Sequence, residues 1–361
     1  MRWSNCIALR EKDASDFAAS HFSEAHRNIL FIGGAGFDPR ALIYPELLAQ
    51  ASQKRVRALL IKEERPDPGD DLIKHADENL RAIQKAISSI DVVTIEVFSE
   101  DLSVTGVRQA ARAVADAIDD KLTDIVIDQS ALSIGVGFPL IRTVLAHEAV
   151  TSGDINVHTV VAFLPGIDRA VTSKPIDKVR DVIGFKGKLG LSTNERTARL
   201  WLPQLTPDHS YQLGLLHKAI DPHDTCPILP FPSDDPRAGD DLVAEYCQEL
   251  VDWQVSNGNL IYAADNNPLD LYRTILRLET ERSQVFEWTG GSTVVLSPTG
   301  SKALALGALM AAVDRDLPMM YIESLGYEVD WDAISRIPGE SAALIHLWLA
   351  GEPYPTADPI D

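Results

Sequence analysis

The sequence ILFIGGAGFDPR occupies residues 29–40 and joins an apolar, strand-like run to a helix-like run through a glycine-rich turn. Such a turn directs backbone N–H groups and a helix N-terminus at whatever lies above a sheet, which suits a phosphate or another anion. The spacing is G-G-x-G rather than the G-x-G-x-x-G of a dinucleotide-binding turn. The acidic residue that should follow could only be Glu63 or Glu64, beside Lys62, so NAD or FAD is disfavoured. Another mode of phosphate or nucleotide binding, and a structural turn with left-handed glycines, remain as alternatives.

The end of the same stretch suggests different roles for two charged residues. Asp38 precedes Pro39, a pattern typical of a helix N-cap followed by proline at the first helical position. Asp38 is therefore expected to cap a helix and not to catalyse. Arg40 is a cation in the first turn, where it opposes the helix dipole, and we expect it to have a specific role. The predicted ligand-binding residues here are Gly33, Gly34, Gly36 and Arg40.

A second strand, turn and helix pattern, STVVLSPTGSKALALGALM, occupies residues 292–310. It lacks the G-x-x-x-x-G-K-[ST] spacing of a P-loop, so a P-loop NTPase is disfavoured. Its hydroxyl groups and single lysine form a plausible anion cradle, and helix capping by Ser or Thr is the alternative. The predicted ligand-binding residues of this turn are Ser297, Thr299, Gly300, Ser301 and Lys302. Because both turns end apolar strands, we expect them to be opposite walls of one crevice in one sheet.

Strand-like and helix-like runs alternate along most of the chain. This alternation predicts an α/β, Rossmann-like fold, a mostly parallel sheet with helices on both faces. The rhythm breaks at Pro165, where prolines become frequent, and resumes after Asn257. We therefore expect a first Rossmann-like part at 1–164, an insertion at 165–257, a second part at 258–350 and a flexible tail at 351–361. The insertion would serve as a lid or an interaction subdomain, and the second part would complete the sheet.

Two further turns follow predicted strands and would lie at the ligand-facing edge of a parallel sheet. The first follows the strand at 124–128 and contributes Gln129, Ser130 and Ser133 as ligand-binding residues. It is not a G-x-S-x-G turn and no histidine is adjacent, so a serine hydrolase is disfavoured. The second turn contributes Asn266, with an Asx-type cap before a helix as the alternative.

Composition narrows the classes of partner. The chain has 361 residues, with 33 Lys and Arg against 53 Asp and Glu, a formal net charge of −20. Such a balance disfavours wrapping of duplex nucleic acid and docking on anionic lipid. No apolar run approaches the length of a membrane span. Because the charged residues 10–13 stand where an apolar stretch would be needed, we expect no signal peptide. We expect a cytoplasmic protein.

The sequence also disfavours a metal centre and a disulfide framework. The three cysteines, Cys6, Cys226 and Cys247, have no C-x-x-C spacing and are odd in number, which favours a reducing compartment. His217 and His223 cluster with two aspartates around Pro222, but the spacing matches no common metal site. We therefore expect a solvated turn there and no metal centre, and no cofactor is identified.

The two turns together resemble the CARF and SAVED Rossmann-like sensor domains of prokaryotic defence systems. The late motif of those domains often runs Thr-Gly-Gly-Thr-Lys before an alanine-rich helix. Here Thr299-Gly300-Ser301-Lys302 stands in that place, one residue short. The resemblance implies a sensor of cyclic oligonucleotides, although the segment 165–257 has no counterpart in it.

Three functions follow from these observations. The first is a ligand-sensing or regulatory protein that binds a nucleotide-like small molecule and acts through a homo-oligomer, such as a homodimer, or a protein partner. The second is an enzyme on a nucleotide or a phosphorylated small molecule, for which no catalytic residue is assigned. Its candidate chemistry would lie at Asp128, Asp265, Arg273 and Lys302. The third is a structural subunit of a defence complex, with the acidic surface and the proline-rich segment as partner contacts.

Overall fold

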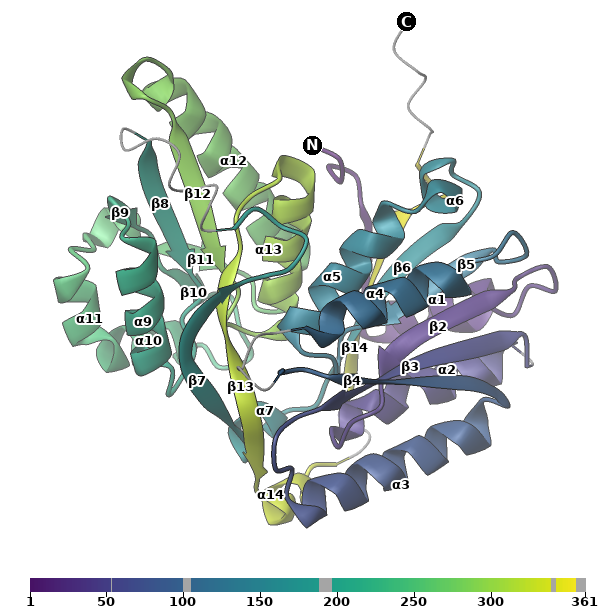
Figure 1. Ribbon diagram of the computed structural model, residues 1–361. Helices are drawn as coiled ribbons and strands as arrows, with labels where there is room; N and C mark the ends of the chain where they lie inside the picture. Colours follow the sequence, from purple (N-terminus) through teal and green to yellow (C-terminus); the bar gives the residue numbers. More distant parts are fainter. Residues whose placement is uncertain (53, 100–104, 188–196, 339–341, 355–361) are drawn as a thin grey trace, which may run out of the picture. The chain divides into compact units, whose positions relative to one another are not determined.

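The computed structural model describes residues 1–52, 54–99, 105–187, 197–338 and 342–354 (Figure 1). The chain divides into two compact units. Unit 1 contains Met1–Ser4 and Pro175–Ser324, and unit 2 contains Asn5–Lys174 and Leu325–Asp361. Residues 355–361, most of the expected flexible tail, lie outside the described residues.

Unit 2 is built on a seven-stranded sheet of order β1-β14-β6-β5-β2-β3-β4. Strands β6, β5, β2, β3 and β4 are parallel, and β14 runs antiparallel to both of its neighbours, β1 and β6. The strands are β1 (Ile7–Arg10), β2 (Ile29–Gly34), β3 (Val56–Glu64), β4 (Ser89–Glu96), β5 (Asp124–Asp128), β6 (Asn156–Phe163) and β14 (Ala343–Ala350). The predicted Rossmann-like, mostly parallel sheet is thus confirmed.

Helices cover both faces of this sheet, as expected of a parallel sheet whose central strands are buried. Figure 1 shows α2 and α3 on one face and α4 and α5 on the other. All residues of β2 and β5 are buried, and Phe31 and Val126 pack with Tyr44 and Leu48 in one core. The helices are α1 (Glu11–His21), η1 (Pro39–Leu42), α2 (Ile43–Ser52), α3 (Asp70–Ala86), α4 (Gly106–Ala117), α5 (Ile134–Leu145), α6 (Glu148–Thr151), α7 (Ile167–Ala170) and α14 (Trp331–Ser335).

Unit 1 is a second α/β arrangement with small parallel sheets. Its strands are β8 (Ala198–Pro203), β9 (Asp224–Thr225), β10 (Ile228–Pro230), β11 (Ile261–Ala263) and β12 (Ser292–Ser297). Strand β8 pairs with both β12 and β9, and β10 pairs with β11, all in parallel. The helices are α9 (Ser210–Ile220), α10 (Ala238–Glu245), α11 (Cys247–Asp252), η2 (Asn257–Asn259), α12 (Pro268–Phe286), η3 (Glu287–Thr289) and α13 (Lys302–Arg315). Two long strands, β7 (Val171–Asp181) and β13 (Met320–Val329), pair with each other, and the division between the units falls within both.

The expectation that both glycine-containing turns belong to one sheet is wrong. Strand β2 lies in the seven-stranded sheet, whereas β12 pairs with β8 in the three-stranded sheet. Among the described residues of the predicted second part, 258–350, only β14 joins the seven-stranded sheet. The predicted insertion, 165–257, supplies β8, and Trp201 of this strand belongs to a separate core in unit 1. The physical reason is that an apolar run reports that a strand is buried, but its pairing partner is chosen by contacts distant in sequence.

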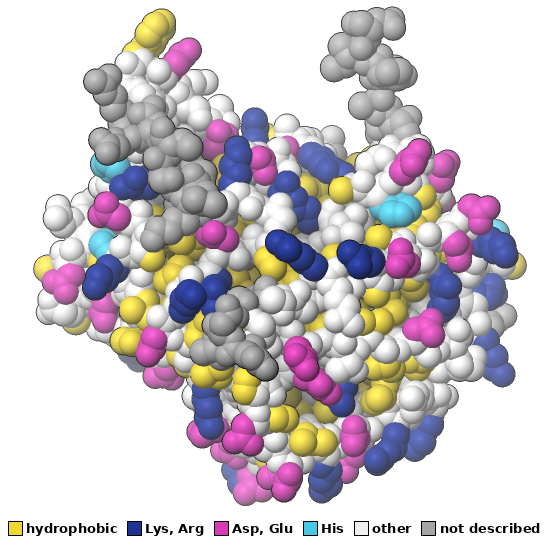
Figure 2. Space-filling model, viewed as in Figure 1, with side chains coloured by type: hydrophobic (Ala, Val, Ile, Leu, Met, Phe, Trp, Pro, Cys, Tyr) yellow, Lys and Arg dark blue, Asp and Glu magenta, His cyan; other side chains and the backbone are white. Residues whose placement is uncertain are grey.

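No helix in the described part of the chain is both long enough and apolar enough to cross a bilayer. On the face that Figure 2 shows, Lys and Arg side chains lie interspersed with Asp and Glu.

Packing of α13 on α12 gives a test of the fold in unit 1. A Cβ at Gly307 would lie 2.5 Å from the Pro268 carbonyl oxygen and 3.0 Å from Leu271 Cβ. We expect Gly307→Ala to lower the free energy of unfolding by about 1–3 kcal/mol, since the backbone of α12 must move. The matched control is Gly214→Ala in α9, where nothing lies within 4 Å, and it should gain about 0.5–1 kcal/mol. Urea unfolding measures both, and equal stability of the two variants would contradict this packing.

Candidate functional site

The strand order of unit 2 places a topological switch point between β2 and β5. From β2 the chain adds β3 and then β4 on one side, and from β5 it adds β6 on the other. Ligands of open α/β sheets bind in the crevice outside the carboxyl ends of the strands at such a point. Strand β2 ends at Gly34 and β5 ends at Asp128. We call this part of unit 2 the switch-point edge.

Glycine in the first turn allows close packing against the turn after β5. A Cβ at Gly34 would lie 3.1 Å from the Ala131 carbonyl oxygen, and one at Gly33 would lie 3.8 Å from Asp128 Cβ. The structure therefore brings together two turns that the sequence predicted at one edge of a parallel sheet. Neither these two glycines nor Gly36 is among the residues with positive φ, so the alternative of a turn with left-handed glycines is wrong. The Gly36 carbonyl instead accepts a hydrogen bond of 2.9 Å from Asn79 Nδ2 on α3.

Arg40 is buried and held between two carboxylates. Its guanidinium lies 2.7 Å from Asp38 Oδ2 and 2.9 Å from Asp168 Oδ1. Burial alone would lower the pKa of Arg40, but the two carboxylates outweigh burial and raise it. Asp38 Oδ1 also accepts the Arg40 N–H at 2.9 Å, which confirms Asp38 as the cap of η1. The arginine predicted to meet an anion is thus already neutralised by protein carboxylates.

Asp128 is a second carboxylate at this edge and is only 2% exposed. Its Oδ1 accepts the Ser130 N–H at 2.8 Å and also a hydrogen bond from Ser130 Oγ. Burial raises the pKa of Asp128 to about 6, although the bonds from Ser130 lower it in part. The Ser130 hydroxyl also accepts the Ala162 N–H of β6 at 2.8 Å, which fixes its position. A carboxyl group with this pKa at a ligand-facing edge is a functional candidate.

Glu63 supplies a third carboxylate, at the N-terminus of α5. Its Oε1 accepts the Ser133 N–H at 2.9 Å, and its Oε2 accepts a bond of 2.9 Å from Arg65. The Ser133 hydroxyl is buried and has no hydrogen-bond partner among the described residues. Gln129 differs from the other predicted residues, because its side-chain amide donates to the Gly137 carbonyl within α5.

Three carboxylates therefore occupy backbone N–H groups that an anion would use at the switch-point edge. They belong to Asp38, Glu63 and Asp128. A hollow of about 370 Å³ opens beside the carboxyl ends of β3 and β4, and its lining includes two more carboxylates, Glu64 and Glu96. Such an edge disfavours a bare phosphate and favours groups that donate hydrogen bonds, such as hydroxyl or amino groups.

An aromatic cluster lies next to the first turn. Phe37 follows Gly36 directly, and its ring centroid is 5.4 Å from that of Tyr327 and 6.2 Å from that of Trp331. The ring of Trp331 in turn stacks on His75 at 3.6 Å. All four residues are partly exposed, so a planar ligand group could stack on the aromatic surface that their neighbours leave open. We call Phe37, His75, Tyr327 and Trp331 the aromatic cluster.

In the second turn, the groups predicted to bind an anion bond mostly to Gln204. The Gly300 N–H donates to Gln204 Oε1 at 3.1 Å, and Thr299 Oγ1 donates to the Gln204 carbonyl. Gln204 is fully buried and its amide also donates to the Leu304 carbonyl. Ser297 Oγ accepts the indole N–H of Trp201 at 2.9 Å. An anion in this turn would have to displace Gln204, a residue that carried no motif in the sequence.

The other predicted residues of unit 1 lie around the start of α13. Ser301 Oγ accepts the Leu304 N–H at 3.3 Å and so caps the helix, which Lys302 begins. The same hydroxyl donates to the Asp265 carbonyl at 3.4 Å, which places the turn containing Asn266 beside it. Arg273 lies on α12, where it donates to the Ser4 carbonyl.

The histidines that the sequence analysis weighed as metal ligands have other partners. His217 stacks on Trp253 with a centroid distance of 5.4 Å, and His223 Nδ1 accepts the Arg199 N–H at 3.1 Å. A different group was missed, because its members are far apart in sequence. His21, Asp124 and His158 meet in the buried interior of unit 2.

Comparisons with known proteins identify no family. No family model and no curated protein matches the chain. Among solved structures, it is similar to a protein of unknown function from Pseudomonas aeruginosa PAO1, with 11% identity, 87% of this chain and 96% of that chain covered, and a TM-score of 0.23. A putative universal stress protein from Pseudomonas aeruginosa UCBPP-PA14 gives 13% identity, 88% and 97% coverage and a TM-score of 0.22. The zinc-inhibited form of the teicoplanin deacetylase Orf2 gives 12% identity, covers 73% of this chain and 95% of that chain, and has a TM-score of 0.26. These TM-scores are too low to transfer a function.

The raised pKa of Asp128 predicts a pH-dependent stability. The folded carboxyl keeps its proton up to about pH 6, whereas the unfolded one loses it near pH 4. Between these values the native state binds more protons, so the free energy of unfolding falls as pH rises. Asp128→Asn should remove this contribution to the slope. Between pH 4 and pH 7 the free energy of unfolding of wild type should therefore fall by about 3 kcal/mol relative to that of the variant.

Chemical denaturation between pH 4 and pH 8 measures this effect. The matched control is Asp91→Asn on an exposed position of β4, which should keep the wild-type slope. An unchanged slope in Asp128→Asn would show that this carboxyl has an ordinary pKa.

Proposed function

We propose that the chain is a sensing or regulatory protein that binds a nucleotide-like small molecule at the switch-point edge of unit 2. The observation that carries this proposal is the set of three carboxylates, Asp38, Glu63 and Asp128, at the same sheet edge as the aromatic cluster, which begins at Phe37. In Rossmann folds a carboxylate accepts hydrogen bonds from ribose hydroxyls. Partly exposed aromatic rings can stack on any of the nucleobases, because every base has a π-face.

Charge decides which part of the ligand binds here. Four carboxylates, those of Asp38, Glu63, Asp128 and Asp168, stand against the two guanidinium groups of Arg40 and Arg65. The local net charge is −2 when all of them are ionised. The sugar and base are therefore the parts that bind this edge, while phosphate groups face solvent or another region of the protein.

The resemblance to CARF and SAVED domains supports a signalling role. It rests on the Thr299-Gly300-Ser301-Lys302 turn and on the glycine-rich turn after β2. In this proposal the protein acts in the cytoplasm, in prokaryotic antiviral defence, and passes the binding signal to a homodimer or a protein partner.

Titration calorimetry with adenosine, AMP, ATP and a panel of linear and cyclic oligonucleotides tests the proposal. We expect at least one of them to bind, with the nucleoside portion supplying most of the affinity. Asp128→Asn should weaken binding at least tenfold, and Phe37→Leu should weaken it about 5- to 100-fold through lost stacking. The matched controls, Asp91→Asn and Phe231→Leu, change exposed residues and should bind like wild type. Absence of binding by every ligand to a folded protein would refute the proposal.

One observation favours an enzyme as the second candidate. The pKa of about 6 at Asp128 suits a general acid or base near neutral pH. Chromatography of each bound ligand after incubation would detect turnover. In the enzymatic case, turnover should fall in Asp128→Asn with a pH profile that loses the limb near pH 6. Binding without turnover at any pH would exclude the enzyme and support the sensing function.

A further inference from the structure

Three metal-binding side chains meet in the interior of unit 2, away from the switch-point edge. His21 ends α1, Asp124 begins β5 and His158 lies in β6. Their potential ligand atoms all lie within 4.8 Å of one another. The side chains are 7%, 0% and 0% exposed, so this is a buried cluster and not a chance group of polar side chains on the surface. We propose that His21, Asp124 and His158 hold a divalent transition-metal ion, for which zinc is the best chemical match.

The donor set determines the class of metal. Two imidazole nitrogens and one carboxylate oxygen suit zinc and its first-row neighbours, whereas magnesium and calcium prefer oxygen ligands alone. Asp124 Oδ1 lies 2.9 Å from His21 Nε2 and 3.2 Å from His158 Nε2. These are hydrogen-bond distances, and ligand atoms bound at about 2.0–2.2 Å to one tetrahedral ion would stand slightly farther apart. Three protein ligands leave a fourth position for water.

The surrounding residues orient the ligands as in established metal sites. His158 Nδ1 lies 2.9 Å from His346 Nε2, and His346 Nδ1 lies 3.0 Å from the Tyr44 hydroxyl. Asp124 Oδ2 accepts a hydrogen bond of 2.6 Å from Thr123 Oγ1. Such partners fix the ring orientation and tautomer of a ligating histidine.

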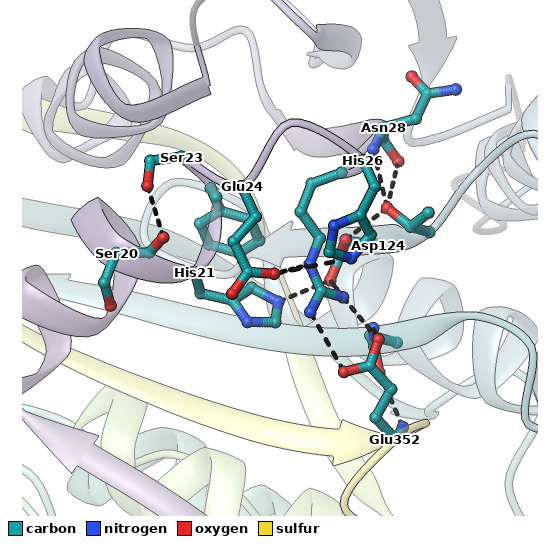
Figure 3. A network of polar contacts seen from close by, with 12 residues as sticks. Ser20, His21, Ser23, Glu24, His26, Asn28, Asp124 and Glu352 are labelled. Atoms are coloured by element: carbon teal, nitrogen blue, oxygen red, sulfur yellow. Dashed lines mark hydrogen bonds and ion pairs between the residues drawn. The ribbon is translucent and has the colours of Figure 1, made fainter.

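Arg27 is a cation that contacts Asp124, and its charge opposes a metal ion. Its Nη1 lies 3.7 Å from Asp124 Oδ1, but the same guanidinium binds Glu352 at 2.7 Å and Glu24 at 3.1 Å. Figure 3 shows Glu24 and Glu352 in the same network of polar contacts as His21 and Asp124. With neutral imidazoles, these four charged side chains sum to −2, which a divalent cation balances.

The site lies at the opposite end of the strands from the proposed ligand edge. Asp124 is the first residue of β5, whereas Asp128 is the last. A metal ion here would join the end of α1 to β5 and β6 and stabilise the fold of unit 2. The inference is thus independent of the proposed nucleotide binding.

The same atoms can also form a closed hydrogen-bond chain without metal. Tyr44 would donate to His346, His346 to His158 Nδ1, and His158 Nε2 to Asp124. With a metal on His158 Nε2, the proton of His158 must be on Nδ1, so its hydrogen bond with His346 reverses. The tautomer of His158 therefore distinguishes the two states.

Metal analysis of the full-length protein, untagged and purified without chelators, tests the proposal. Mass spectrometry of elements should find about one zinc per chain, and native mass spectrometry should find the same mass increment on the intact protein. Metal content should fall at least tenfold in His21→Gln and in His158→Gln. His26→Gln, an exposed histidine of the same segment, is the matched control and should keep the metal.

A second measurement covers the case in which the ligand variants fail to fold. Wild-type protein is unfolded in denaturant with a chelator, refolded, and titrated with zinc or cobalt. We expect Tm to rise to a plateau at one equivalent, a cobalt absorption band of low-coordinate N/O ligation, and ¹⁵N spectra with the His158 proton on Nδ1. Less than about 0.1 metal per chain, with no Tm shift from zinc, cobalt, iron, manganese or nickel, would overturn the proposal. Equal metal content in wild type and in folded His158→Gln would overturn it as well.

Discussion

Strand β5 pairs with β2 in parallel from the pair Ile29 and Asp124 to the pair Ile32 and Ile127, and this pairing positions both polar clusters of unit 2. At the carboxyl end it sets Gly33 beside Asp128, so the two turns of the switch point pack together. At the amino end it sets Asp124 in the interior, within reach of histidines from α1 and β6. A buried parallel sheet satisfies its own backbone, so only groups at the strand ends are left to contact ligands.

The two aspartates of β5 show how environment separates chemically identical groups. Burial alone would raise the pKa of both. At Asp124 the hydrogen bonds from His158 and His21 outweigh burial and lower the pKa, so the carboxylate stays ionised. At Asp128 burial dominates, and its pKa rises to about 6. The first is a carboxylate suited to hold a cation, and the second is a group that can exchange a proton near neutral pH.

Carboxylates also account for the kind of ligand that the switch-point edge favours. Glycine-rich turns and helix N-termini attract anions because their backbone N–H groups are free. Here Asp38, Glu63 and Asp128 already accept such groups, and in unit 1 the amide of Gln204 does so at Gly300. In a turn with the composition of a phosphate-binding loop, the backbone N–H groups can thus be bonded within the protein. The carboxylate oxygens that bond them can still accept hydrogen bonds from the donor groups of a ligand.

The sequence alone determined the fold class, the strand ends that carry polar residues and the capping role of Asp38. These features are local, since apolar runs, turn residues and caps act over a few neighbouring positions. It also predicted Gly34, Arg40 and Ser130 at a ligand-facing edge, and the structure places them in the two turns of the switch point or beside them. Only the tertiary structure decided that β12 belongs to another sheet, that Arg40 is neutralised by Asp168, and that His21, Asp124 and His158 meet. Each of these depends on strand pairing and packing between residues that are far apart in the chain, for which no local pattern carries a signal.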